Sequence, residues 1–220
     1  MTEVPAGDFL MGCNEEVDAD CDEDEQPLHT VTLSAFEIDV TEVTQDQYAA
    51  CVTAGECPEP ACEWNCERAD YPASCVTFAA ASAYCAWAGK RLPTEAQWEK
   101  AARGEAGAKY PWGNDEPTCD LANMGGCGDA VAPVGSVPDG ASPYGALDMA
   151  GNMVEFVSDW YSATYYATSP TVDPTGPESG SRFGGRGGGY RSDADYQRAS
   201  KRDVYDPPDQ GAALGFRCAR

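Results

Sequence analysis

The sequence predicts an α+β domain with little regular secondary structure. Three short segments with helix signals fall in the first half of the 220 residues, and a strand-like run precedes them. The second half is rich in turn-forming residues, and eleven cysteines stand in close groups along the chain. A chain of this length buries a core of its own, and no linker divides it. We therefore expect a single domain over residues 1–220.

Each expected element has a local signal. Residues 29–40 (HTVTLSAFEIDV) alternate branched or aromatic residues with polar ones, which predicts a half-buried strand. Residues 44–47 (TQDQ) and 94–97 (TEAQ) are capping boxes, which mark the first turns of helices. Residues 78–88 are alanine-rich with helical apolar spacing and are followed by a glycine. From residue 109 onward, glycine, proline and asparagine favour turns over long elements.

The charge of the chain excludes some classes of partner. With 37 acidic and 14 basic side chains, the formal charge is -23, which repels nucleic acid and anionic membranes. The sequence lacks an apolar run near 18 residues, so we expect no membrane span. Residues 1–12 lack a signal-peptide pattern, so we expect any export signal to have been removed or never present. Residues 15–25 (EEVDADCDEDE) predict a solvated acidic loop.

The cysteines favour disulfides over zinc. The spacing from Cys57 to Cys66 does not match a two-knuckle zinc pattern, and the chain's one histidine, His29, is distant in sequence. Disulfides indicate an oxidising, extracytoplasmic location, which means periplasmic, cell-surface or secreted. Two local pairs are expected between neighbouring cysteines: Cys13 with Cys21, and Cys119 with Cys127. The five cysteines of a cysteine-rich insert at about 51–75 stay unassigned, and the odd total leaves at least one thiol unpaired or bonded to another chain.

Residues 86–99 (AWAGKRLPTEAQWE) resemble the most recognisable stretch of the formylglycine-generating enzymes, or sulfatase-modifying factors. Further matching motifs occur in the family's order, at Met11-Gly12, Glu42-Val43-Thr44, 110–114 (YPWGN), 151–156 (GNMVEF), 186–190 (RGGGY) and 215–218 (GFRC). The resemblance covers essentially the whole chain. It implies a variant of the C-type lectin fold with little regular secondary structure, and a disulfide between Cys85 and Cys218.

The resemblance also identifies what this chain lacks. In the enzymes, two cysteines five residues apart bind copper and oxidise a substrate cysteine, because soft thiolates hold Cu(I) and exchange with thiols. The corresponding positions here are Ser192 and Gln197. We therefore expect no copper and no formylglycine-generating activity, unless a cysteine distant in sequence, such as Cys75, approaches the cleft. Iron-dependent relatives need a histidine cluster from a further domain, which His29 alone does not supply.

A calcium site is implied at the Gly-Asn-x-x-Glu motif. The family's ligands map onto the carboxylates of Asp148 and Glu155 and the main-chain carbonyls of Gly151 and Met153. Hard oxygen ligands in a tight turn suit Ca²⁺. The alternative is a turn that hydrogen bonds of Asn152 stabilise without a metal.

The resemblance implies a second calcium site nearby. Its ligands would be the side chain of Asn123, the carbonyl of Met124 and Asp129 or a neighbour. The loop is shorter here than in the enzymes, which leaves the assignment of Asp129 open.

The expected function is a non-catalytic, calcium-stabilised recognition module. Its C-terminal region would contact an unknown protein, a peptide or a small ligand. The expected contact residues are Tyr190, Arg191, Ser192, Asp193, Asp195, Tyr196, Gln197 and Tyr205. Asp193 and Asp195 are of types that perform acid–base chemistry, but solvated carboxylates are the preferred interpretation in so acidic a chain.

Three alternatives stay open. The first is a variable protein diversified by a retroelement, since such proteins share this fold and vary in the stretch that corresponds to residues 191–213. The second is an enzyme of the same superfamily with a non-oxidase chemistry, which a cleft with strongly shifted pKa values would favour. The third is an accessory envelope protein, which a cysteine bonded to another chain would favour.

Overall fold

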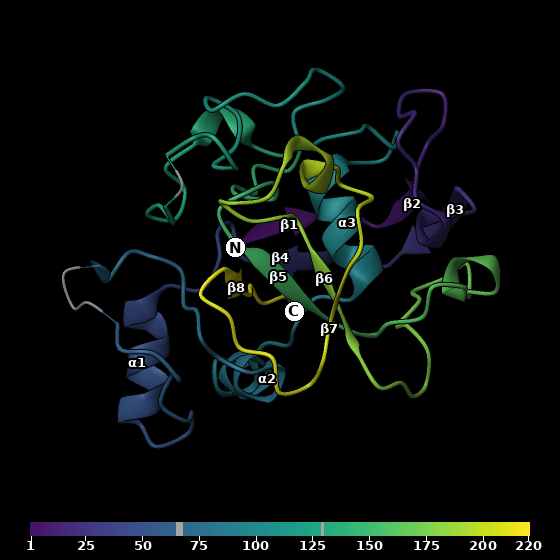
Figure 1. Cartoon of the computed structure of the whole chain (residues 1–220). Helices are drawn as coiled ribbons and strands as arrows, with labels where there is room; N and C mark the ends of the chain where they lie inside the picture. The colour runs from purple at the N-terminus through teal and green to yellow at the C-terminus, as the bar shows by residue number, and fades with distance from the viewer. Residues whose placement is uncertain (65–67, 129) are drawn as a thin grey trace.

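The computed structural model describes residues 1–64, 68–128 and 130–220 (Figure 1). Cys66 and Asp129, both of interest in the sequence, lie outside the described residues. The strands are β1 (Thr2–Val4), β2 (Gly7–Met11), β3 (His29–Leu33), β4 (Phe36–Ile38), β5 (Val154–Trp160), β6 (Phe183–Arg186), β7 (Asp203–Tyr205) and β8 (Leu214–Gly215). The α-helices are α1 (Gln45–Thr53), α2 (Phe78–Trp87) and α3 (Glu95–Arg103). Single 3₁₀ turns are η1 (Glu23–Glu25), η3 (Pro138–Gly140), η4 (Tyr165–Ala167) and η5 (Ala194–Gln197).

The helix starts are confirmed. Thr44 and Gln47 form a complete capping box at α1, and Thr94 and Gln97 form another at α3. Thr77 caps α2 by accepting a hydrogen bond from the Ala80 amide. These signals succeed because each is closed by residues three positions apart, with no contribution from the rest of the chain.

The strand predicted over 29–40 is two strands with different partners. β3 pairs with β2, whereas β4 pairs with β1, so each forms a separate antiparallel ribbon. The break falls at Ser34, whose amide and hydroxyl both donate to the carboxylate of Asp173 at 2.8 Å. The remaining strands form a sheet in the order β7-β6-β5-β8, in which β5 and β8 run parallel.

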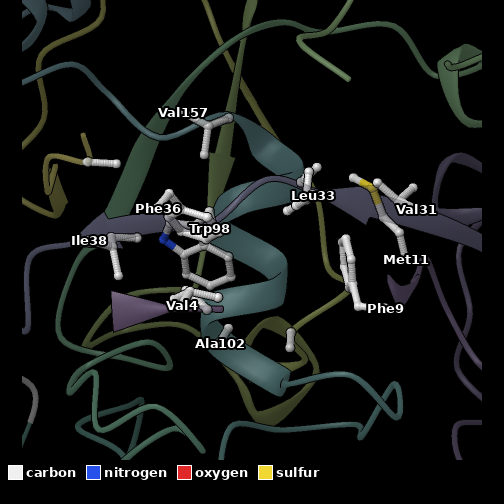
Figure 2. Packing of buried hydrophobic residues seen from close by; sticks show 14 of the residues in the cluster. Val4, Phe9, Met11, Val31, Leu33, Phe36, Ile38, Trp98, Ala102 and Val157 are labelled. Atoms are coloured by element: carbon white, nitrogen blue, oxygen red, sulfur yellow. The ribbon is translucent and has the colours of Figure 1, made fainter. Parts of the chain in front are cut away.

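Helix α3 lies at the centre of the main core. The fully buried Trp98 packs among Val4, Phe36 and Ile38 of the β1–β4 ribbon (Figure 2). A second apolar cluster packs α1 and α2 against the four-stranded sheet. The polar residues of α3 are buried as well, and Glu99 forms ion pairs with Arg103 and with Arg186 of β6. The core is therefore partly ionic, which suits a fold with few regular elements.

Five disulfides link the ten cysteines of the described residues. The predicted pairs Cys13–Cys21, Cys85–Cys218 and Cys119–Cys127 are all formed. Within the insert, the structure adds the pairs Cys51–Cys57 and Cys62–Cys75. Among the described helices, none is long and apolar enough to cross a lipid bilayer.

The acidic loop over residues 15–25 is not simply solvated, as the sequence suggested. Asp18 and Glu25 are buried, and both accept hydrogen bonds from the guanidinium of Arg198. A buried guanidinium requires carboxylate partners, and this loop supplies them from positions 173 and 180 residues away in sequence.

Candidate binding face

The C-terminal segment folds back sharply after β6. Gly187 and Gly188 adopt the left-handed backbone region, with φ of 93° and 63°. A Cβ atom at Gly188 would lie 2.6 Å from the Tyr196 carbonyl oxygen, so glycine permits the close return of the chain. After this turn, the Tyr190 amide donates to the Asn152 carbonyl at 3.0 Å, and β7 pairs with β6. These contacts position the predicted face.

The two positions that correspond to the catalytic cysteines carry structural side chains. The hydroxyl of Ser192 accepts a hydrogen bond from the Gly189 amide at 3.0 Å. Gln197 is fully buried, and its amide nitrogen donates to the carbonyls of Ser192 at 3.4 Å and Asp193 at 3.3 Å. Both side chains therefore stabilise the loop that, in the family pattern, would carry a thiolate pair.

Cys75 does approach this region. Its amide donates to the Gly211 carbonyl at 3.1 Å, and Gly211 lines a cavity beside Ser192. However, the Cys75 sulfur is bonded to Cys62. The part of the chain that the structure describes thus places no free thiol at the cleft.

The cavity has a volume of about 380 Å³. Its polar lining comes from Ser192, Tyr205, Asp209 and Gln210, and Val154 contributes to its apolar wall. Burial raises the pKa of the Tyr205 hydroxyl above its ordinary value, and the charge of Asp203 adds to the shift. The phenol is therefore neutral at physiological pH, which suits hydrogen bonding to a ligand.

The predicted contact residues divide into exposed and buried sets. Arg191, Asp193 and Tyr196 are exposed, while three others are partly buried: Ser192, Asp195 and Tyr205. Tyr190 and Gln197 are 6 % and 0 % exposed, so their assignment to a contact surface is corrected. The Tyr190 amide donates a hydrogen bond to the Asn152 carbonyl, which draws this residue inward. The Arg191 guanidinium lies 5.1 Å from the centre of the Tyr190 ring.

Asp195 is part of an ion-pair network, although its side chain is 41 % exposed. It forms ion pairs with Arg198 at 2.8 Å and Lys201 at 3.0 Å. Although burial opposes the shift, hydrogen bonds from Lys201 and Arg198 lower the pKa of Asp195 below its ordinary value. The carboxylate is thus part of the structural support of the face.

This support is an ion-pair clamp between the acidic loop and the C-terminal segment. We define the clamp as Arg198, Lys201 and Arg202 together with their carboxylate partners. Arg198 binds Glu25 through two nitrogens, at 2.6 and 2.8 Å. Arg202 binds Glu95 of α3 in the same two-pronged way, at 2.9 and 3.0 Å, and Lys201 pairs with Asp22. Bidentate pairs of this kind fix orientation as well as distance.

The residues assigned to the first calcium site differ in how well they suit a metal. Glu155 is fully buried, and its two oxygens accept hydrogen bonds from Arg217 at 2.7 Å each and from the Trp98 indole at 2.8 Å. A carboxylate engaged in this way does not fit a calcium ligand. Asp148 fits better, since it is nearly buried and accepts a single hydrogen bond among the described residues, from the Gly135 amide to Oδ2 at 2.5 Å.

Glu42, which the sequence motifs did not identify as a ligand, is also part of this site. Glu42 is 1 % exposed; Oε1 accepts a hydrogen bond from Asn152 at 2.9 Å, whereas Oε2 has no partner among the described residues. Burial, and then the charges of Asp148 and Glu155, raise the pKa of Glu42 well above its ordinary value. The available signal was its place in the matching motif Glu42-Val43-Thr44.

The other assigned residues surround Asn152. The Asn123 carbonyl accepts from the Asn152 amide at 2.7 Å, and the Met124 carbonyl accepts from Cys127 at 3.0 Å. Gly151 lies beside Asn123 in an isolated bridge, and Met153 is fully buried. The side chain of Asn152 itself bonds Asn123, Ala132 and Glu42. The hydrogen bonds of the metal-free alternative are therefore present.

Side chains alone form no calcium cage among the described residues. Within the described ranges, Cys13, Asp18 and Cys21 are the one group of three His, Cys, Asp or Glu side chains whose ligand atoms all lie within 4.8 Å. The two sulfurs of that group are bonded to each other, so it is not a metal site. A calcium ion near Glu42 and Asp148 would have to take its remaining ligands from main-chain carbonyls or water.

We predict that calcium stabilises the protein through Glu42 and Asp148. In calcium at a hundredfold its dissociation constant, the free energy of unfolding should exceed that in EDTA by about 2.7 kcal/mol. The substitution Glu42→Gln should remove this difference, because it removes the carboxylate whose Oε2 has no partner among the described residues. The control substitution Asp206→Asn, at an exposed residue, should leave the difference unchanged. Denaturant unfolding with and without EDTA, with metal analysis of protein purified without chelator, checks the prediction. Equal stability in both buffers with no bound metal would contradict it.

The irregular fold defines a class of protein, the formylglycine-generating-enzyme type of domain. A family model described as the sulfatase-modifying factor enzyme 1-like domain matches residues 1–220. The chain belongs to this family.

Relatives with curated names include enzymes. The chain is similar to the formylglycine-generating enzyme of Streptomyces coelicolor, with 37% identity over 98% of this chain and 87% of that protein. It is also similar to the hercynine oxygenase of Mycolicibacterium smegmatis, with 34% identity over 70% of this chain and 44% of that protein. The chain thus spans less than half the length of the hercynine oxygenases that it matches.

Solved structures support the same fold. Treponema denticola variable protein 1 matches with a TM-score of 0.83 and 26% identity, over 100% of this chain and 94% of that one. PvdO from Pseudomonas aeruginosa matches with a TM-score of 0.85 and 28% identity, over 99% and 92%. The low content of regular secondary structure expected from the sequence is therefore a property of the fold.

Proposed function

We propose that this chain is a non-catalytic, calcium-stabilised recognition module of its family, and that residues 190–213 carry its binding face. The observation that carries the proposal is the role of Ser192 and Gln197. Both side chains hold the backbone of the loop, and neither supplies a sulfur for copper or for exchange with a substrate thiol. The family's oxidase chemistry has no reactants at these positions.

The division of the C-terminal segment into anchors and exposed positions supports this function. The buried Arg198 and Arg202 fix the segment to the acidic loop and to α3. Arg191 and Tyr196, before these anchors, and residues 206–210, after them, are exposed. A rigidly held loop with exposed side chains loses little conformational entropy when it binds a partner.

The same division favours a second candidate, a variable protein whose exposed positions change while its anchors stay fixed. The similarity to Treponema denticola variable protein 1 over the whole chain supports this candidate. A third candidate, an enzyme with a non-oxidase chemistry, is supported by the enzymatic relatives. It lacks a matched acid–base pair at the face, because Asp195 is engaged by Arg198 and Lys201.

We infer an extracytoplasmic location from the disulfides. Five of them occur among the described residues, and such bonds persist in oxidising compartments.

Selection against a random peptide library tests the proposed face. The calcium-loaded protein is the bait, and each selected peptide is then measured against the variant Arg191→Ala/Tyr196→Ala. We expect at least a tenfold loss of affinity, because these exposed side chains would contribute most of the contact. The matched control is Arg182→Ala, an exposed arginine that lies over the ring of Tyr161 instead. Peptides that bind all three proteins equally would contradict the assignment of the face.

A further inference from the structure

The cysteine-rich insert forms a second concave surface, separate from the face at residues 190–213. This groove has a volume of about 530 Å³ and lies between the exposed side of α1 and the residues that follow Cys57. In Figure 1, α1 stands at the edge of the molecule. The groove is lined by Ala49 and Val52 of α1 and by Glu59, Cys62, Glu63 and Trp64 of the insert.

The walls of the groove are held in place by covalent and aromatic contacts. The Cys51–Cys57 disulfide joins α1 to the start of the insert, and Cys62–Cys75 closes the other end. The Trp64 ring packs edge-on against Tyr48, with 5.5 Å between ring centres, and the Tyr48 hydroxyl donates to the Pro58 carbonyl at 2.9 Å. A groove built in this way is organised before any ligand arrives.

The chemistry of the lining is aromatic and acidic. Trp64 is only partly buried, so part of its indole surface is available at the groove. Glu59 and Glu63 are exposed beside it, and none of the described residues that line the groove is basic. The charge of Glu59 also acts on Tyr48, the ring that Trp64 packs against. Burial, and to a smaller extent the Glu59 charge, raise the pKa of the Tyr48 hydroxyl to about 12.

We propose that this groove binds the side-chain ammonium group of lysine in a basic peptide. An organic cation on a tryptophan face is attracted by the π-system, and two carboxylates neutralise its charge. The methylene stem of lysine matches the apolar wall formed by Ala49 and Val52. The overall charge of -23 adds a longer-range attraction for a basic partner. A neutral sugar would also stack on tryptophan and donate hydrogen bonds to the carboxylates, but it carries no positive charge for Glu59 and Glu63 to balance.

The test compares two probes of nearly equal shape. Nα-acetyl-lysine methylamide carries the ammonium group, and Nα-acetyl-norleucine methylamide has the same apolar stem without it. Isothermal titration calorimetry on the full chain is expected to show at least tenfold tighter binding of the lysine probe. The lysine affinity should fall as salt is added, because the carboxylates are exposed.

Three variants locate the binding. Glu59→Gln/Glu63→Gln should weaken the lysine probe about tenfold and leave the norleucine probe unchanged, and Trp64→Phe should weaken the lysine probe about threefold or more. Glu56→Gln, an exposed insert residue outside the groove lining, is the matched control and should bind normally. Circular dichroism confirms folding, and the glutamine variants keep the test valid if Trp64→Phe fails to fold.

Several outcomes would overturn the proposal. These are equal affinities for the two probes, an equal loss in Glu56→Gln, or binding of methyl glucoside in place of the lysine probe. Because Arg191 and Tyr196 lie outside the groove lining, the variant that tests the binding face should leave lysine binding unchanged.

Discussion

Replacing Arg198 by methionine is expected to lower the free energy of unfolding by about 3–5 kcal/mol. The Arg198 side chain is fully buried, and its removal would strand the buried carboxylate of Glu25 and leave the buried Asp18 to pair with Lys109 at 3.4 Å. Urea unfolding followed by circular dichroism at pH 7 measures the loss.

The design includes two controls. Arg182→Met removes an exposed arginine and should cost less than about 1 kcal/mol. Adding Glu25→Gln to Arg198→Met should restore part of the stability, because it removes the stranded charge. An Arg198→Met protein within 1 kcal/mol of the wild type would show that the clamp does not hold the C-terminal segment.

The loss of stability in Arg198→Met should also depend on pH, and the pKa of Glu25 determines the direction of that dependence. Burial raises the pKa of Glu25 even against the opposing effect of Arg198, so without the guanidinium it should rise further. A carboxyl whose pKa is higher in the folded state loses stability as pH rises. The destabilisation of Arg198→Met should therefore be larger at pH 7 than at pH 5.

Removing the Cys85–Cys218 disulfide should have an effect of similar size. The two cysteines are 133 residues apart, for which the chain-entropy model gives about 5 kcal/mol. Cys119–Cys127 spans only 8 residues, for which the same model gives about 2.5 kcal/mol. Double alanine variants of each pair, unfolded under identical conditions, provide the comparison. Equal losses in the free energy of unfolding of the two variants, or a larger loss in the Cys119–Cys127 variant, would contradict this account.

The elements that could be predicted from the sequence are those closed by nearby residues. The capping boxes at Thr44 and Thr94 and the short-range disulfide at Cys119 need no information from elsewhere in the chain. The family motifs added the long-range pair Cys85–Cys218. The division of 29–40 into two strands depends on Asp173, which the local alternation of residues does not encode.

The site was less predictable for the same reason. Whether Glu155 is free for a metal depends on Arg217, and whether Gln197 is exposed depends on the return of the chain over Gly188. Within the insert, five cysteines so close in sequence allow several pairings, and only their positions in space separate them. Burial and ion pairing across long sequence distances are the properties that local patterns leave out.

The most direct test of the central claim is copper binding and peptide oxidation by the purified protein. The protein is supplied with Cu(I) and with a cysteine-containing sulfatase-type peptide, and mass spectrometry follows conversion of the cysteine to formylglycine. We expect no retained copper and no conversion, because Ser192 and Gln197 stand where a thiolate pair would be needed. Stoichiometric copper with conversion of the peptide would contradict the assignment of this chain as a recognition module.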